Sequence, residues 1–333
     1  MASEDVLVIG GGAFGLWTAR ACAARGLRVA VADAGRVGGL DGASATPIGA
    51  LAPHLAAPWT PMKALQLRAL LEMPARLGAL QAETGIPCGY ARLGRLQPLD
   101  DLAARERAEA RAADAGAAWG GAARMRVLDP AGGGWLSTPR FGALHDDLSA
   151  RLDARATLGA LRDGLLRAGG EALDGWRLNR VEPDGSARFD QGLRRAPCVV
   201  LAAGWQAVQG LPDAPLPALE PEHGQAARLA LSAPADAPLI GAPGLWIVPQ
   251  ADGTVAVGAT SERGRRDLDV DAALDDVLAR AAARVPALAD APVLERWAGL
   301  RPRLATRKPL IGPVTGRPGL WLAAGGFKIG LAL

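Results

Sequence analysis

The stretch from Asp5 to Asp33, DVLVIGGGAFGLWTARACAARGLRVAVAD, constrains the fold of this chain most. An apolar run meets a Gly10-x-Gly12-x-x-Gly15 motif, a helical segment follows, and a second apolar run ends on an acid. In such a βαβ unit the three glycines permit a tight turn, the approach of a pyrophosphate, and close packing of helix on sheet. The helix start directs free N–H groups and the positive end of its dipole at the phosphates. Asp33, 18 residues after Gly15, can accept hydrogen bonds from ribose hydroxyls, so the segment predicts an adenine dinucleotide site.

The bulk composition indicates a globular enzyme of two domains. The chain has 333 residues, of which 50% are hydrophobic and 21% charged. A net charge of +3 does not indicate a nucleic-acid-binding surface, and three scattered cysteines predict neither a disulfide framework nor a metal site. No run of about 18 apolar residues predicts a membrane span. We therefore expect a cytoplasmic protein; the sequence predicts no oligomeric state.

The nucleotide-binding pieces lie at the start, middle and end of the chain. CVVLAAGW (198–205) is a near-continuous apolar strand, as in a parallel sheet covered on both faces. Helices are expected at 61–85 and 267–285, and a hairpin at 244–262. The β-rich pieces between would form a second domain in two insertions. A simple nicotinamide dehydrogenase would keep its dinucleotide domain contiguous.

Several motifs together resemble the D-amino acid oxidase family of FAD enzymes, which includes glycine oxidase and sarcosine oxidase. The matches are the opening motif through Asp33, GASATPIGALAPH, CVVLAAGW, VGATSE, WAGLRP and LAAGGFKIG. They cover essentially the full length, and the last two are the most specific. The resemblance implies an α/β fold with a Rossmann-like FAD-binding domain (1–85, 144–212 and 298–333) and an inserted mixed β-sheet substrate domain (86–143 and 213–297).

The resemblance also implies a non-covalent FAD site, since the last third has no cysteine and Pro47 stands where histidine-linked relatives carry the histidine. A helix start near the C-terminus would stabilise negative charge on reduced flavin. The implied FAD contacts are Gly10, Gly12, Ala13, Phe14 and Gly15 (pyrophosphate turn), Asp33 and Ala34 (ribose), Ala43 and Ser44 (phosphates or ribityl chain), Ile48, Gly49 and Ala50 (isoalloxazine), Leu178 (adenine), Gly204 after the middle strand, and Gly326, Phe327, Lys328, Ile329, Gly330 and Leu331 (flavin N1/C2 carbonyl).

Two residues are implied as catalytic. Arg301 matches the family's carboxylate-binding arginine, and a guanidinium suits that role because its planar fork makes two parallel hydrogen bonds. The alternative for Arg301 is an interdomain ion pair. Lys328, one of only three lysines, falls where many members carry a second arginine. Three roles stay open for Lys328: a partner for the substrate carboxylate, a cation beside the flavin, or a surface lysine.

The expected reaction is oxidation of the C–N bond of a small amino acid or N-alkyl amino acid. A hydride equivalent would move to flavin N5, the imine would hydrolyse, and oxygen or another acceptor would reoxidise the flavin. Two features depart from the family pattern. The only tyrosine is Tyr90, whereas members acting on D-amino acids often add a tyrosine to the carboxylate grip, and the final helix is expected to begin where the sequence stops, at Leu333.

Two alternatives stay open. The family includes the oxidative domain of a wobble-uridine-modifying tRNA enzyme, and Arg301, Arg303, Arg307 and Lys308 would then form a phosphate patch. The other alternative is a non-catalytic flavin-binding subunit of an amine dehydrogenase. A hydrolase or metalloenzyme has no support, because GxSxG, HExxH and CxxC are absent.

Overall fold

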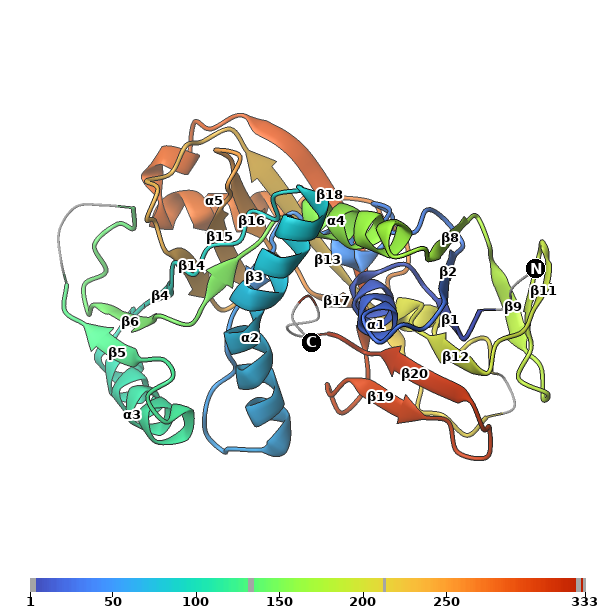
Figure 1. The fold of residues 1–333 in the computed structure, drawn as a ribbon. Helices are drawn as coiled ribbons and strands as arrows, with labels where there is room; N and C mark the ends of the chain where they lie inside the picture. The colour runs from blue at the N-terminus through green and yellow to red at the C-terminus, as the bar shows by residue number, and fades with distance from the viewer. Residues whose placement is uncertain (1–3, 131–134, 212–213, 328–330, 332–333) are drawn as a thin grey trace.

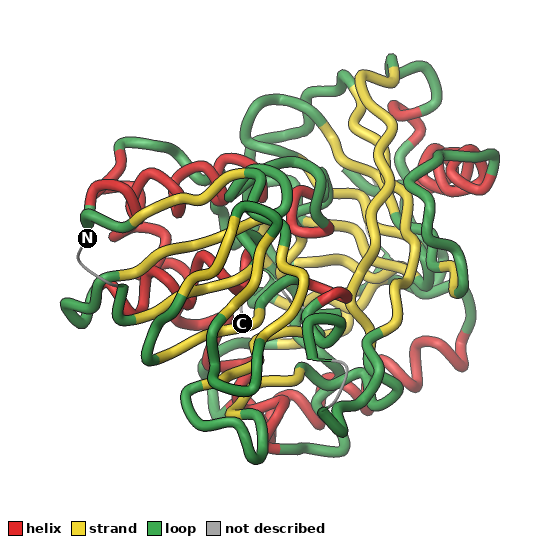
Figure 2. Tube along the Cα trace, turned by 90° about the vertical axis from the view of Figure 1, so that its right-hand side faces the viewer, coloured by secondary structure: helices red, strands yellow, loops and turns green. Residues whose placement is uncertain are grey.

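The computed structural model describes residues 4–130, 135–211, 214–327 and 331. Its strands form two main groups, which lie side by side when the molecule is turned by 90° (Figure 2). Among the described helices, none is long and apolar enough to cross a membrane.

A six-stranded sheet occupies one end of the molecule (Figure 1). Its neighbours are parallel except for the outer pair, β19 and β20. Alternate residues of its strands enter two separate cores, one against helices and one against a small three-stranded sheet and its adjoining loops. This confirms the expectation that 198–205 is covered on both faces. The order is β19 (Leu310–Pro313), β20 (Leu320–Ala324), β12 (Cys198–Leu201), β1 (Val6–Ile9), β2 (Val29–Asp33), β8 (Glu171–Asp174).

The helices α1 (Ala13–Ala23), α4 (Ala154–Arg167) and α2 (Pro61–Thr84) pack together on the first of these faces. Capping explains where α2 begins and ends. Thr60 accepts a hydrogen bond from the Lys63 N–H at 3.3 Å, and Gly85 closes the helix with φ 74°. The opposite face carries the three-stranded sheet β9 (Leu178–Val181), β10 (Ala187–Phe189) and β11 (Gly192–Arg194).

A nine-stranded mixed sheet forms the other half (Figure 1). All its pairs are antiparallel except β4 with β14. Helix α5 (Ala273–Arg284) packs on one face, and α3 (Leu102–Trp119) on β5 and β6. The order is β18 (Val293–Arg303), β13 (Glu220–Leu229), β16 (Val255–Gly258), β15 (Leu245–Pro249), β14 (Leu239–Ala242), β4 (Arg95–Pro98), β6 (Ala143–Asp146), β5 (Met125–Leu128), with β17 (Glu262–Arg263) also on β13.

The helix expected from Asp267 begins six residues later, at Ala273, so that prediction was wrong at its start. Two aspartates explain the difference. Asp267 accepts a hydrogen bond from the Asp269 N–H, and Asp271 accepts one from the Ala273 N–H. Such local side-chain bonds compete with helix formation and hold 267–271 as a loop.

The strands of the six-stranded sheet all come from the three segments predicted for the FAD domain. Two predicted boundaries, at 144 and 298, fall inside β6 and β18 instead of between elements. Both strands pair along their length within the nine-stranded sheet, β18 with β13 from Val293 to Arg303. A division by sheet membership would therefore place these boundaries after Asp146 and after Arg303.

Candidate functional site

A cavity of about 990 Å³ opens at the carboxyl ends of β1, β2 and β12. In doubly wound sheets this is where ligands bind. Most of the predicted FAD contacts line it, although they come from segments far apart in the sequence: Gly10, Gly12, Ala13, Phe14, Asp33, Ala34, Ala43, Ser44, Ala50, Leu178, Gly204, Gly326, Phe327 and Leu331.

The glycine turn leaves no space for side chains. Gly10 has φ 112°, and a Cβ there would lie 2.5 Å from the Ala202 carbonyl carbon. A Cβ at Gly15 would lie 1.8 Å from the Gly10 carbonyl oxygen. Gly15 is absent from the residues that line the cavity, because it packs α1 against the turn. One side of the backbone at this helix start therefore packs tightly against neighbouring backbone, and its other side faces the cavity.

Polar groups complete this end of the cavity. Asp33 accepts hydrogen bonds from the N–H groups of Gly11 (2.7 Å) and Gly35 (2.8 Å), one on each carboxylate oxygen. Each oxygen retains capacity for a further donor such as a ribose hydroxyl. The Ser44 hydroxyl accepts the Ala13 N–H at 3.0 Å, which holds the 43–45 loop against the start of α1. A helix N-terminus beside an anchored carboxylate fits the pyrophosphate and ribose of an adenine dinucleotide.

A second cavity of about 850 Å³ lies between the 48–50 loop and one face of the nine-stranded sheet. Ile48 and Gly49 line this cavity and not the first. The two cavities meet, since they share the lining residues Ala43, Thr46, Ala50, Arg301, Phe327 and Leu331.

Arg301 lies on β18 where the cavities meet. Its Nη2 donates to the Thr260 carbonyl oxygen at 2.9 Å and to the Ser261 hydroxyl at 3.0 Å. Its guanidinium carbon lies 5.3 Å from the centre of the Phe327 ring. The Nε atom is buried and has no hydrogen-bond partner among the described residues. Burial lowers the pKa of the guanidinium, and the nearby Glu222 carboxylate opposes that shift.

Glu222 is a functional candidate that the sequence reasoning missed. It lies on β13 directly opposite Arg301, with its carboxylate 3.6 Å from Arg301 Nη2 and 3.1 Å from Arg303 Nε. Glu222 and Arg303 are both buried, and the Ser261 hydroxyl also donates to Glu222. One carboxylate thus lies between two arginines behind the meeting point of the cavities. No motif marks this contact, which depends on the register of β13 with β18.

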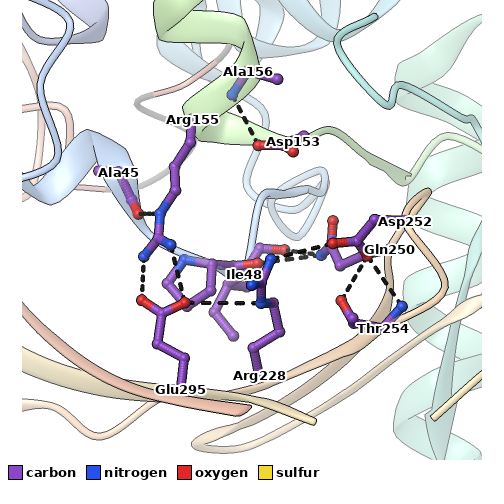
Figure 3. Close-up of polar contacts among 11 residues, drawn as sticks. Ala45, Ile48, Asp153, Arg155, Ala156, Arg228, Gln250, Asp252, Thr254 and Glu295 are labelled. Carbon is purple, nitrogen blue, oxygen red and sulfur yellow. Dashed lines mark hydrogen bonds and ion pairs between the residues drawn. The ribbon is translucent and has the colours of Figure 1, made fainter. Parts of the chain in front are cut away.

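The loop that contains Ile48 is fixed from both halves of the molecule (Figure 3). Arg155 on α4 donates to the Ala45 carbonyl oxygen at 3.0 Å and forms a two-bond ion pair with Glu295 on β18. The Gln250 side-chain amide donates to the carbonyl oxygens of Pro47 and Ile48, each at 3.2 Å. The loop is therefore held in place between the two cavities.

Comparison with known proteins identifies the family. The DAO family, described as FAD dependent oxidoreductase, matches residues 5–333. This chain belongs to the DAO family. A glycine oxidase from Pseudomonas putida is 32% identical to it over 99% of this chain and 91% of the relative.

Solved structures with a similar fold support this assignment. Glycine oxidase from Geobacillus kaustophilus superposes with a TM-score of 0.88 at 24% identity, covering 100% of this chain and 92% of that one. Iminodiacetate oxidase from Chelativorans sp. gives 0.84 at 26% identity, covering 98% and 91%. The predicted fold class and FAD as cofactor are confirmed, and full-length matches of this kind do not favour the tRNA-modifying or non-catalytic alternatives.

The structure does not place every predicted residue of this DAO-family chain in the site. Lys328, Ile329 and Gly330 lie outside the described residues, so their predicted roles stay predictions. Tyr90 is not among the described residues that line either cavity. The predicted phosphate patch is not a single surface, because Arg303 is buried against Glu222. Among the described residues no cluster of three or more metal-ligating side chains is found.

Proposed function

We propose that this chain oxidises the C–N bond of a small amino acid or N-alkyl amino acid and that Arg301 binds the substrate carboxylate. The buried, unpartnered Nε of Arg301, at the junction of the two cavities, carries this proposal. A buried donor without an acceptor is costly, and a carboxylate would complete its hydrogen bonding. Thr260 and Ser261 hold the other end of the guanidinium, so its plane is fixed before substrate arrives.

FAD, when bound, supplies the oxidising chemistry by accepting a hydride equivalent from the carbon that bears the amine. The chain's own residues position the cofactor and the substrate relative to each other. We assign the pyrophosphate to Gly10, Gly12, Ala13 and Ser44, the ribose to Asp33, and the flavin ring to the 48–50 loop. The site therefore needs to hold one C–H bond against the ring, and residues from both halves of the molecule line the cavities where this bond would lie.

Names of relatives support the substrate class: the matches include proteins named glycine oxidase and iminodiacetate oxidase. A role for Lys328 as a cation near the substrate or flavin, oxygen as electron acceptor, and a cytoplasmic location remain predictions from the sequence.

The test is anaerobic absorbance of the purified FAD-loaded protein mixed with glycine, sarcosine, proline and D-amino acids. We expect at least one of them to bleach the flavin. Full bleaching by dithionite but by none of these amines would contradict the proposal. Absence of flavin absorbance even after FAD is added would contradict the cofactor assignment as well.

A further inference from the structure

One row of residues crosses five strands of the nine-stranded sheet at the second cavity. The strand register places Trp297 on β18 opposite Ala226 on β13, Ala226 opposite Gly258 on β16, Gly258 opposite Trp246 on β15, and Trp246 opposite Gly241 on β14. All of these except Gly258 line the cavity. The row therefore carries two indole rings with two very small residues between them.

The small residues make a trough between the tryptophans. Adjacent strands lie about 4.8 Å apart, so three spacings place the backbones of Trp246 and Trp297 roughly 14 Å apart. Ala226 has only a methyl group and leaves its part of the row open to the cavity, whereas Gly258 is covered by Ile48 and does not line the cavity. The Ile48 side chain packs over Gly258, since a Cβ there would lie 2.9 Å from its Cδ1 atom, and it forms the floor of the trough beside Trp246.

Glycines also set the positions of the two rings. A Cβ at Gly299 would lie 2.3 Å from the Trp297 ring, so the ring lies over Gly299 and toward Arg301, two residues farther along β18. A Cβ at Gly241 would lie 3.4 Å from the Trp246 ring. Both rings thus lie close to the sheet and present apolar surface to the cavity.

The charge nearest Trp246 is already compensated. Arg95 stacks on the Trp246 ring, with 5.5 Å from its guanidinium carbon to the ring centre. Its guanidinium pairs at 2.9 Å with Asp146, which is fully buried. This wall offers an aromatic surface beside a neutralised arginine that also lines the cavity, and Pro98, Leu99 and Leu144 extend the apolar lining.

We propose that the substrate is an amino acid with a bulky apolar arm, aromatic or branched, that lies between Trp246 and Trp297 while its carboxylate binds Arg301. This inference rests on the proposed function. Glycine has no such arm and would leave the trough filled only with water. An aromatic arm gains from burial of its surface and from stacking on the indoles. The arm attaches either to the amine nitrogen or to the Cα atom, and the experiment distinguishes the two.

The first measurement needs no turnover. The oxidised FAD-loaded protein is titrated with acetate and with phenylacetate, and binding is followed by perturbation of the flavin absorbance. We expect phenylacetate to bind at least ~10-fold more tightly, the effect of burying a phenyl group. Trp246→Ala and Trp297→Ala should remove most of that preference, and the milder Trp246→Phe should retain part of it. Trp321→Ala, at a 45% exposed tryptophan on β20, is the matched control and should leave the preference unchanged.

The second measurement compares anaerobic flavin reduction by glycine, sarcosine, N-benzylglycine, D-phenylalanine and L-phenylalanine. Faster reduction by N-benzylglycine than by glycine supports an arm on nitrogen, and faster reduction by a phenylalanine supports an arm on Cα. Equal binding of acetate and phenylacetate, or glycine as the most efficient reductant, would overturn the inference. If neither these five nor proline and other D-amino acids bleach the flavin, the proposed function fails, while the carboxylate titration still decides whether the trough binds an apolar arm.

Discussion

The two cavities are built in different ways. The first is lined by turns that directly follow strands, and its contacts come from short runs such as Gly10 to Phe14 and Asp33 to Arg36. One wall of the second is a row of single residues from neighbouring strands, and Gly241 and Trp297 of this row are 56 positions apart in the sequence. The first therefore depends on backbone geometry, and the second on strand register. Substitutions in the two cavities should therefore have different consequences: loss of the cofactor in the first, and weaker substrate binding in the second.

The largest effect is expected from Gly15→Ala in the first cavity's turn. The added Cβ would meet the Gly10 carbonyl oxygen at 1.8 Å, so α1 must move away from the turn that faces the pyrophosphate. We expect loss of FAD from the purified protein, measured by flavin absorbance per chain, and a lower Tm. Gly78→Ala in α2, where a Cβ meets nothing within 4 Å, is the control and should keep FAD. Normal FAD content in Gly15→Ala would show that the turn tolerates displacement.

Arg301→Met tests the junction of the two cavities. Loss of two charge-assisted hydrogen bonds, each worth about 1.5–3 kcal/mol, should lower kcat/KM by roughly 10²–10⁴-fold while FAD stays bound. Arg301→Lys should recover only part of the loss, because an ammonium lacks the planar fork. Exposed Arg307→Met is the control. An unchanged kcat/KM in Arg301→Met would assign substrate binding to another residue.

Glu222→Gln tests whether the second cavity depends on partners from a neighbouring strand. Two arginines would lose their carboxylate, and breaking a buried pair typically costs about 3–5 kcal/mol of unfolding free energy. Arg301 would also be less well positioned, so we expect KM to rise roughly tenfold with a smaller change in kcat. Kinetics and urea unfolding measure the two effects. Glu222→Asp should restore part of the KM, whereas a purely structural role would change stability and leave KM unaffected.

The smallest effect concerns the back of the same sheet. The Gln225 side chain, the Ala273 N–H and Arg265 lower the pKa of Asp271 to about 2, from 3.8. The stability that Asp271 contributes is therefore fully present above pH 4 and is lost as the pH falls toward 2. In Asp271→Asn the unfolding free energy should depend less steeply on pH between 4 and 3 than in the wild type. Urea unfolding at several pH values measures this, with exposed Asp236→Asn as the control.

The same contrast explains how much the sequence predicts. The turn from Gly10 to Gly15, Asp33, and the ends of the helix predicted over 61–85 follow from local backbone chemistry, and the structure has them where the sequence predicts. The family resemblance, confirmed here, also indicated Arg301. Glu222 and the row from Trp297 to Gly241 were not predictable, because a pairing register is a tertiary property. The helix expected from Asp267 failed for a local reason, the side-chain bonds of two aspartates, which apolar periodicity does not report.

The strand order of the six-stranded sheet has a consequence for synthesis of the protein. Its central strand β1 comes from residues 6–9, and β20, which pairs with β12, comes from residues 320–324. Chains fold progressively as they leave the ribosome, yet this sheet stays incomplete until residue 324 has emerged. The first cavity also takes lining residues from 323–327. The complete cavity therefore forms only after residue 327 has been made, and until β20 has emerged the edge of β12 that pairs with it stays exposed.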